Sequence, residues 1–145
     1  MSPAIPVAFP RFHDIYKEGK AGESHGRIDD DRGRTWESTL TRALKSKSPV
    51  VQLATWNDWG EGTGIEPTRE FGYRDLEVLQ RLRGELVDKA FVPDADDLRL
   101  PHRLYLMRLS LASKPALKAG IDAACELLVT GKVKEARAAI KSLEK

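Results

Sequence analysis

Residues 50–67 read VVQLATWNDWGEGTGIEP, and this stretch decides the fold. It opens with β-branched and apolar residues after Pro49, then changes abruptly to three glycines, three carboxylates and two indoles. A short apolar run between such breakers is typical of a buried strand. In parallel α/β folds, active sites lie where the strands end and the βα loops begin. The sequence therefore predicts a strand over residues 50–55 with a polar site directly after it.

Strand and helix patterns alternate on either side of this stretch. Residues 4–9, AIPVAF, fit a second short strand, and residues 17–34 read as a long polar loop. A helix is expected from Thr35, which is suited to cap it, and another over residues 73–91. Their apolar faces are Trp36, Leu40, Ala43 and Leu44 in the first, and Leu76, Leu79, Leu82 and Leu86 in the second. This order predicts two parallel β/α units over residues 1–92.

Residues 93–145 are predicted to form a separate helical extension. Three apolar stripes recur at helical spacing: Leu100, Leu104, Met107 and Leu111; Leu117, Ile121, Ala124 and Leu128; and Val133, Ala136 and Ile140. Gly131 suits the end of the second helix, which predicts an αα-hairpin. Because two parallel strands do not make a sheet that buries both faces, we expect the chain to be the C-terminal part of a larger α/β protein.

Composition excludes several classes of function. Lys and Arg total 24 against 22 Asp and Glu, a net charge of +2 with no basic block, so no nucleic-acid surface is expected. No apolar stretch approaches the ~20 residues of a membrane span, and residues 1–12 lack the features of a secretory signal, which leaves the compartment open. The acidic run at residues 29–31 lacks the closing glutamate of a calcium loop and is interpreted as a solvated turn. The single cysteine, Cys125, is expected to be a small buried hydrophobe.

The candidate catalytic pair is Asp58 and Glu61. Residues three apart on a regular strand point to opposite faces, but Gly60 and Gly62 allow a turn that aims both carboxylates at one cleft. Two carboxylates are what glycoside hydrolysis needs, and their separation selects retention or inversion. Trp56 and Trp59 would supply flat apolar surfaces for sugar rings. The alternative stays open: Asp58 as a helix cap, Glu61 solvated, and both indoles in the core.

The stretch ATWNDWGEGTGIEP resembles the catalytic segment of the endo-α-mannosidase family, glycoside hydrolase family 99, and its WbsX-like bacterial relatives. There the pattern runs Asn-Glu-Trp-His-Glu-Gly-Thr and then Ile-Glu-Pro. The Asn-Asp variant is also similar to glycoside hydrolase family 71. The resemblance covers residues 1–90, with PVAFPRFHD as the penultimate barrel strand, VVQLATWND as the last, and FGYRDLEVLQRL as the closing helix.

This resemblance implies the last two β/α units of a (β/α)8, TIM-type barrel that hydrolyses α-linked glycans without a metal or other cofactor. Asp58 would be the base that deprotonates the sugar's 2-hydroxyl, and Glu61 the acid/base for the leaving group. Two residues depart from the family 99 pattern: Asp58 is one methylene shorter than its Glu, and Gly60 replaces its His. The implied substrate-binding residues are Asn57, Trp59, Trp56, Glu66, His13 and Asp14.

These observations leave three functional hypotheses. The first is a glycoside hydrolase-like fragment with carbohydrate as its ligand, little activity alone, and a need for missing N-terminal barrel units or for self-association. The second is a glycan-binding protein without catalysis. The third is a helical protein-interaction module, because residues 127–140, LLVTGKVKEARAAI, resemble a tetratricopeptide-type hairpin. A single hairpin without flanking repeats favours a helical decoration over such a module.

Overall fold

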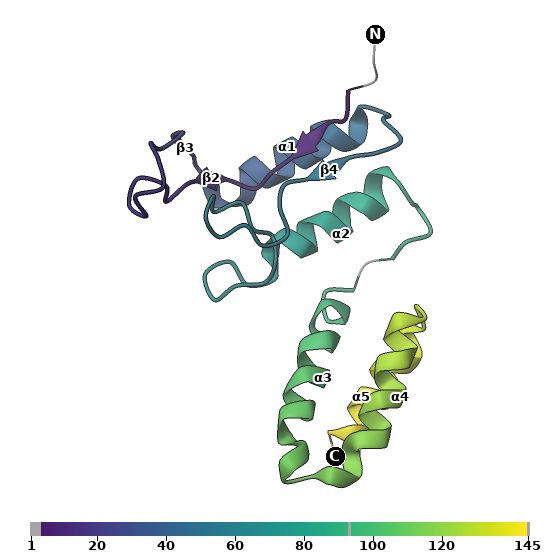
Figure 1. The fold of residues 1–145 in the computed structure, drawn as a ribbon. Helices are drawn as coiled ribbons and strands as arrows, with labels where there is room; N and C mark the ends of the chain where they lie inside the picture. Colours follow the sequence, from purple (N-terminus) through teal and green to yellow (C-terminus); the bar gives the residue numbers. More distant parts are fainter. Residues whose placement is uncertain (1–3, 93, 145) are drawn as a thin grey trace. The chain divides into compact units, whose positions relative to one another are not determined.

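The computed structural model describes residues 4–92 and 94–144. The chain divides into two compact units, Met1–Pro93 and Asp94–Lys145. The first unit mixes strands and helices, whereas the second is helical (Figure 1). About half of the chain is helical and its strands are few and short, which confirms the mixed α/β class.

The two predicted strands pair in parallel. β1, Val7–Ala8, lies beside β4, Gln52–Leu53, with Val7 opposite Gln52 and Ala8 opposite Leu53. Both strands are much shorter than the six residues expected for each. Pro6 and Pro10 flank β1 and have no N–H to donate, so they limit the ladder at this strand. Because the two strands are parallel, their carboxyl ends point in the same direction, as the predicted site requires.

Two helices pack against this pair and form the core of the first unit. α1 spans Arg34–Lys45 and α2 spans Arg74–Leu86 (Figure 1). The buried apolar core consists of Ala8, Trp36, Leu40, Ala43, Ile65 and Leu82. This confirms most of the predicted faces, but Leu86 was wrongly placed among them: it is the last residue of α2 and is exposed.

The start of α1 also differs from the prediction. The helix begins at Arg34, and its N-cap position is occupied by Gly33, which makes no side-chain capping bond. Thr35 lies inside the first turn, where its hydroxyl donates to the carbonyl of Asp29 at 2.6 Å. The left-handed backbone of Gly33, with φ +86°, turns the chain into the helix in place of a side-chain cap.

The long loop over residues 17–34 contains more structure than its composition predicts. β3, Arg27–Ile28, pairs antiparallel with β2, Phe12–His13, and a 3₁₀ turn follows at Asp31–Gly33. The solvated-turn interpretation is wrong for Asp30, which is partly buried between two arginine side chains. Its partners are 19 and 44 residues away in sequence, so the local pattern gave no sign of them.

The second unit is a set of three helices around their own core. α3 spans Leu100–Leu109, α4 Lys118–Val129 and α5 Val133–Leu143, joined by 3₁₀ turns at Ser110–Ala112 and Pro115–Leu117 and preceded by another at Asp97–Arg99. The buried apolar residues are Leu100, Leu104, Ile121, Ala124, Ala136 and Ile140, each from a predicted stripe. Gly131 follows α4 with φ +75°, as expected at a helix end. Across residues 4–92 and 94–144, no helix has the length and apolar character needed to cross a bilayer.

Candidate functional site

The loop that follows β4 folds back on itself and presents its tip beyond the strand. The N–H of Thr55 donates to the carbonyl of Thr63 at 3.1 Å, and their hydroxyls lie 2.8 Å apart. The N–H of Ile65 donates to the carbonyl of Thr55 at 3.1 Å. These bonds form the stem of the loop. Residues 56–62, which carry most of the candidate site, form its tip.

Asp58 closes a turn within this tip. Its Oδ1 accepts the backbone N–H of Glu61 at 3.0 Å, and its own N–H donates to the hydroxyl of Thr55 at 3.0 Å. The turn thus places the two candidate carboxylates on one short segment. No helix begins at Asp58, so the helix cap that the sequence left open is wrong; Asp58 instead accepts a backbone N–H within a turn, which uses one of its two carboxylate oxygens.

Gly62 makes the close approach of this loop to its neighbour possible. Its φ is +65°, and a Cβ at this position would lie 3.1 Å from the carbonyl oxygen of His13. Gly60 does not have a positive φ, so of the two glycines expected to bend the chain, Gly62 provides the left-handed backbone. The sequence predicted a turn that depends on glycine, and in the structure Gly62 is the position where a side chain would not fit without strain.

The loop after β1 and the loop after β4 meet through backbone and side-chain bonds. The N–H of His13 donates to the carbonyl of Glu61 at 2.9 Å, and the N–H of Ile15 donates to that of Gly60 at 3.0 Å. One residue further on, the Tyr16 hydroxyl donates to Oε1 of Glu61 at 2.8 Å. Polar residues from both strand ends therefore come together, as parallel strands predict.

Tyr16 lies among several carboxylates. The hydrogen bond to Glu61, partial burial and the negative charges of Glu61, Asp58 and Asp14 together raise the pKa of Tyr16 above its ordinary value. The ring also makes an edge contact with His25, with centroids 5.7 Å apart. Tyr16 is thus a neutral hydrogen-bond donor inside an acidic cluster.

Asp14 is buried, and its carboxylate is engaged by the protein itself. It accepts the N–H of His25 at 2.7 Å, the hydroxyl of Ser24 at 3.1 Å and the N–H of Tyr16 at 3.3 Å. Burial acts to raise the pKa of Asp14, but these hydrogen bonds outweigh it and lower the pKa below its usual range. Asp14 therefore ties residues 24–26 to the segment that carries Tyr16.

The two indoles of the motif are on the surface. Trp56 is 54% exposed and Trp59 is 59% exposed, so the interpretation that both belong to the core is wrong. Trp59 and His13 line one hollow of ≈ 450 Å³, together with Phe71 and Glu70. A second hollow, of ≈ 380 Å³, shares Trp59, Phe71 and Glu70 with the first. Such volumes lie within the range of small-ligand sites.

The remaining predicted binding residues lie outside the walls of these two hollows. Asn57 is exposed, as is the neighbouring Trp56. Glu66 is partly buried, and its backbone N–H donates to the carbonyl of Trp56 at 2.9 Å. The structure thus separates the candidate residues into an acidic cluster around Glu61 and an aromatic hollow around Trp59.

An ionic cluster, consisting of the buried Arg11 and Asp75 and the partly buried Asp30 and Arg74, contacts the loop after β4. The Arg11 guanidinium donates to Asp75, to Asp30 and to the carbonyl of Gly64 in the loop after β4, the last at 2.9 Å. It also lies 3.7 Å from the centroid of the Phe71 ring. This one side chain therefore connects the loop after β1, the loop after β4 and the start of α2.

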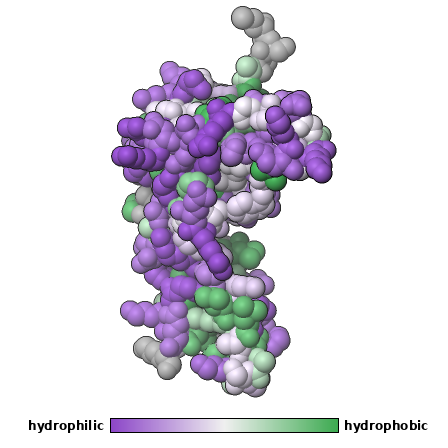
Figure 2. All heavy atoms as spheres, turned by 90° about the vertical axis from the view of Figure 1, so that its left-hand side faces the viewer, coloured by the Kyte–Doolittle hydropathy of each residue, from purple (hydrophilic) through white to green (hydrophobic). Residues whose placement is uncertain are grey.

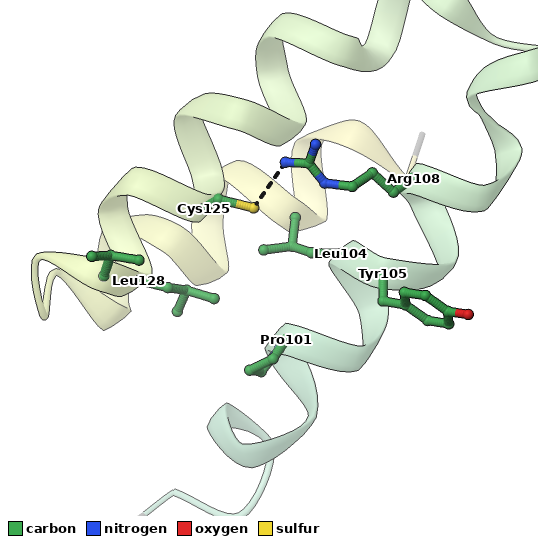
Figure 3. Close-up of a pocket in the computed structure, with 7 residues that line it drawn as sticks. Pro101, Leu104, Tyr105, Arg108, Cys125 and Leu128 are labelled. Carbon is green, nitrogen blue, oxygen red and sulfur yellow. Dashed lines mark hydrogen bonds between the residues drawn. The ribbon is translucent and has the colours of Figure 1, made fainter.

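The helical unit carries an apolar hollow of its own. Figure 2 shows apolar side chains gathered on one face of this unit. A hollow of ≈ 450 Å³ lies between α3 and α4, lined mainly by Pro101, Leu104, Leu128 and Val129 (Figure 3). Cys125 is part of its wall rather than fully buried, and Arg108 donates to its Sγ at 3.4 Å.

Sequence reasoning identified the turn and its carboxylates but missed their supports. Tyr16 follows the first strand just as the acidic cluster follows the second, and this position is the signal that could have identified it. Nothing local marks Arg11 as a partner of Asp75, 64 residues away. In the described part of the chain, no three His, Cys, Asp or Glu side chains group as a metal ion requires. Comparison of the chain with known protein families, curated proteins and solved structures found no match.

Proposed function

We propose that residues 1–92 belong to the active-site end of a glycoside hydrolase-like (β/α)8 barrel that cleaves α-linked glycans. The observation that carries this proposal is the meeting of Asp58, Glu61 and Tyr16 at the carboxyl ends of two parallel strands. That edge is where barrel enzymes assemble their catalytic residues. The motif's resemblance to glycoside hydrolase families 99 and 71 supports the same assignment.

In this proposal, the two carboxylates have different tasks. Glu61 is the acid/base: it protonates the departing glycosidic oxygen and then takes a proton from the attacking water. Asp58 acts on the sugar's 2-hydroxyl through Oδ2, since Oδ1 is used by the N–H of Glu61. Its side chain is one methylene shorter than the glutamate of family 99, so the substrate has to approach the turn more closely.

The exposed indoles of Trp59 and Trp56 are the proposed sugar platforms. Trp59 and Phe71 form part of one hollow, beside the imidazole of His13. Flat apolar rings next to polar groups suit sugars, which carry C–H faces and hydroxyl edges. Trp56, exposed on the other side of Asp58 in sequence, would contact a neighbouring sugar unit.

β1 and β4 form a sheet of two strands within the described residues, and a parallel sheet of this kind needs further strands beside it. Within residues 4–92 and 94–144, β1 and β4 pair only with each other, which leaves one edge of each strand open. Exposed edges and apolar residues near them, such as Ile5 and Val50, favour pairing with further strands. We therefore propose that additional β/α units, or a second copy of the chain, complete the site, and that the chain alone has little activity.

The test uses the longest open reading frame that contains this sequence, together with the chain itself. Both are incubated with α-mannan and α-glucan oligosaccharides, and the products are separated by chromatography. We expect turnover from the longer protein, little from the chain, and a loss of at least about 10²-fold in turnover with Glu61→Gln. The matched control is Glu85→Gln on the exposed face of α2, which should leave turnover unchanged.

Each outcome of this test discriminates between hypotheses. Unchanged turnover in Glu61→Gln would refute the assignment of Glu61. Binding of these oligosaccharides, seen as a change in the fluorescence of Trp56 and Trp59, without any turnover in either protein would favour a glycan-binding protein without catalysis.

A second candidate function concerns the helical unit. Its apolar hollow between α3 and α4 is bordered by large exposed apolar side chains, including Tyr105 and Val129. Such surfaces occur in protein-interaction modules. This candidate uses residues 94–145, whereas the hydrolase proposal uses residues 1–92, so the two are independent.

A further inference from the structure

We propose that Tyr16 is a positioning residue for Glu61, holding its carboxylate so that a single oxygen is free to exchange a proton with the substrate. The inference rests on the proposed hydrolase function and adds a residue to its catalytic machinery. Tyr16 lies 45 positions from Glu61 in the sequence, on the loop that follows the other strand.

The geometry divides the two oxygens of Glu61 between two tasks. Oε1 accepts the Tyr16 hydroxyl at 2.8 Å, which is the length of a good O–H···O bond. The other oxygen, Oε2, is left for the glycosidic oxygen. A carboxylate anchored in this way has fewer orientations to lose when the substrate binds, and catalysis benefits from such preorganisation.

The tyrosine itself is fixed before any substrate arrives. Its backbone N–H donates to the buried Asp14 at 3.3 Å, and its ring rests edge-on against His25. The flanking segment is bound to the tip of the other loop by the N–H of His13, which donates to the carbonyl of Glu61. A backbone hydrogen bond from His13 and a side-chain hydrogen bond from Tyr16 therefore both hold Glu61 against the loop after β1.

Tyr16 is a donor at neutral pH. A phenol, with an ordinary pKa of 10.0, is already protonated there, and the hydrogen bond to Glu61 and the charges of Glu61, Asp58 and Asp14 raise the pKa of Tyr16 further. A neutral phenol donates to Glu61, whereas a phenolate would repel it. Tyr16 thus has the protonation state that the proposed role needs.

The first experiment measures this coupling without relying on turnover. Tyrosine is labelled with carbon-13 in its ring, and the signal of Tyr16, assigned by its absence in Tyr16→Phe, is followed by NMR at rising pH. We expect Tyr16 to titrate above 10.0, the ordinary phenol value. Glu61→Gln should shift this titration to lower pH by more than Asp58→Asn does, since Asp58 contributes charge and no hydrogen bond. Identical titration of Tyr16 in the wild type and Glu61→Gln would overturn the proposal.

The second experiment tests the positioning role in the glycan-cleaving protein. Tyr16→Phe keeps the ring and removes the hydroxyl, and we expect kcat to fall by about 10²-fold with KM little changed. Tyr105→Phe, the same change in the helical unit, should alter neither constant. An unchanged kcat in Tyr16→Phe would overturn the positioning role. Coupled titration in a protein that cleaves no glycan would refute the hydrolase proposal and still support the pairing of Tyr16 with Glu61.

Discussion

Replacing Arg11 by Met should destabilise the first unit by about 3 kcal/mol. Arg11 and Asp75 are both nearly buried, with side-chain exposures of 10% and 4%. Removing one member of a buried ion pair costs about 3–5 kcal/mol, because the other charge is left uncompensated. Asp75 keeps its ion pair with Arg74, whose Nε and Nη2 lie 3.0 Å and 2.9 Å from Oδ1, so the low end of that range applies. Methionine fills much of the space of the arginine stem, which limits the loss of packing.

Tryptophan fluorescence during urea unfolding measures this effect in the right part of the molecule. All three tryptophans lie in residues 1–92, and the indole N–H of the fully buried Trp36 donates to the carbonyl of Asp75 at 2.7 Å. For a unit of this size, a loss of 3 kcal/mol lowers Tm by about 12–24 °C. The matched control is Arg81→Met, which breaks a largely solvent-exposed pair with Glu37 and should change stability by less than about 1 kcal/mol.

A double variant separates two costs of removing Arg11: the charge of Asp75 that has lost its partner, and the packing of the arginine side chain that is lost. In Arg11→Met/Asp75→Asn, the buried carboxylate that has lost Arg11 and keeps only Arg74 is replaced by a neutral amide, so we expect part of the lost stability to return. Equal losses in Arg11→Met and Arg81→Met would refute the burial argument. A double variant less stable than Arg11→Met would refute the explanation that the charge of Asp75, left without Arg11, causes part of the loss.

Two further predictions concern the same unit. Burial acts to raise the pKa of Asp30, but the hydrogen bonds and charges of Arg74 and Arg11 outweigh burial and lower this pKa below 3.8, the ordinary value. The stability that ionised Asp30 contributes is therefore present above pH 3.8 and is lost as the pH falls below that value. Urea midpoints between pH 3 and 7 should therefore depend less on pH in Asp30→Asn than in the wild type; equal slopes would contradict this. Gly62→Ala should cost more than Gly72→Ala: both positions have left-handed backbones, worth about 1–2 kcal/mol, but only Gly62 of the two approaches another residue, His13. Equal urea midpoints would contradict the steric argument.

The sequence was sufficient to predict the elements whose signals are local. The apolar run before the glycine cluster predicted β4, and the position of Trp36 and Leu40 four residues apart predicted the buried face of α1. Both signals depend on a few consecutive residues and on the periods of strand and helix. The helical stripes of residues 100–140 were predictable for the same reason.

Interactions between distant segments were not predictable. The pairing of Arg27–Ile28 with Phe12–His13 and the contact of Asp30 with Arg74 depend on how the loops fold over one another. Asp30 appeared solvated because its partners, Arg11 and Arg74, lie outside any local window. For the candidate site, the pattern identified Asp58 and Glu61, whereas the hydrogen bond from Tyr16 required knowledge of how the two loops meet.

The reach of Arg11 has a practical consequence for protein engineering. Its guanidinium holds the carbonyl of Gly64, in the loop that bears the candidate acids, while its other nitrogens are held by carboxylates on two further segments. Transplanting residues 54–67 alone into another scaffold would leave that loop without its anchor. A successful graft would have to carry Arg11, Asp30 and Asp75 with it, so the smallest transferable part of this site is made of four separate pieces of chain.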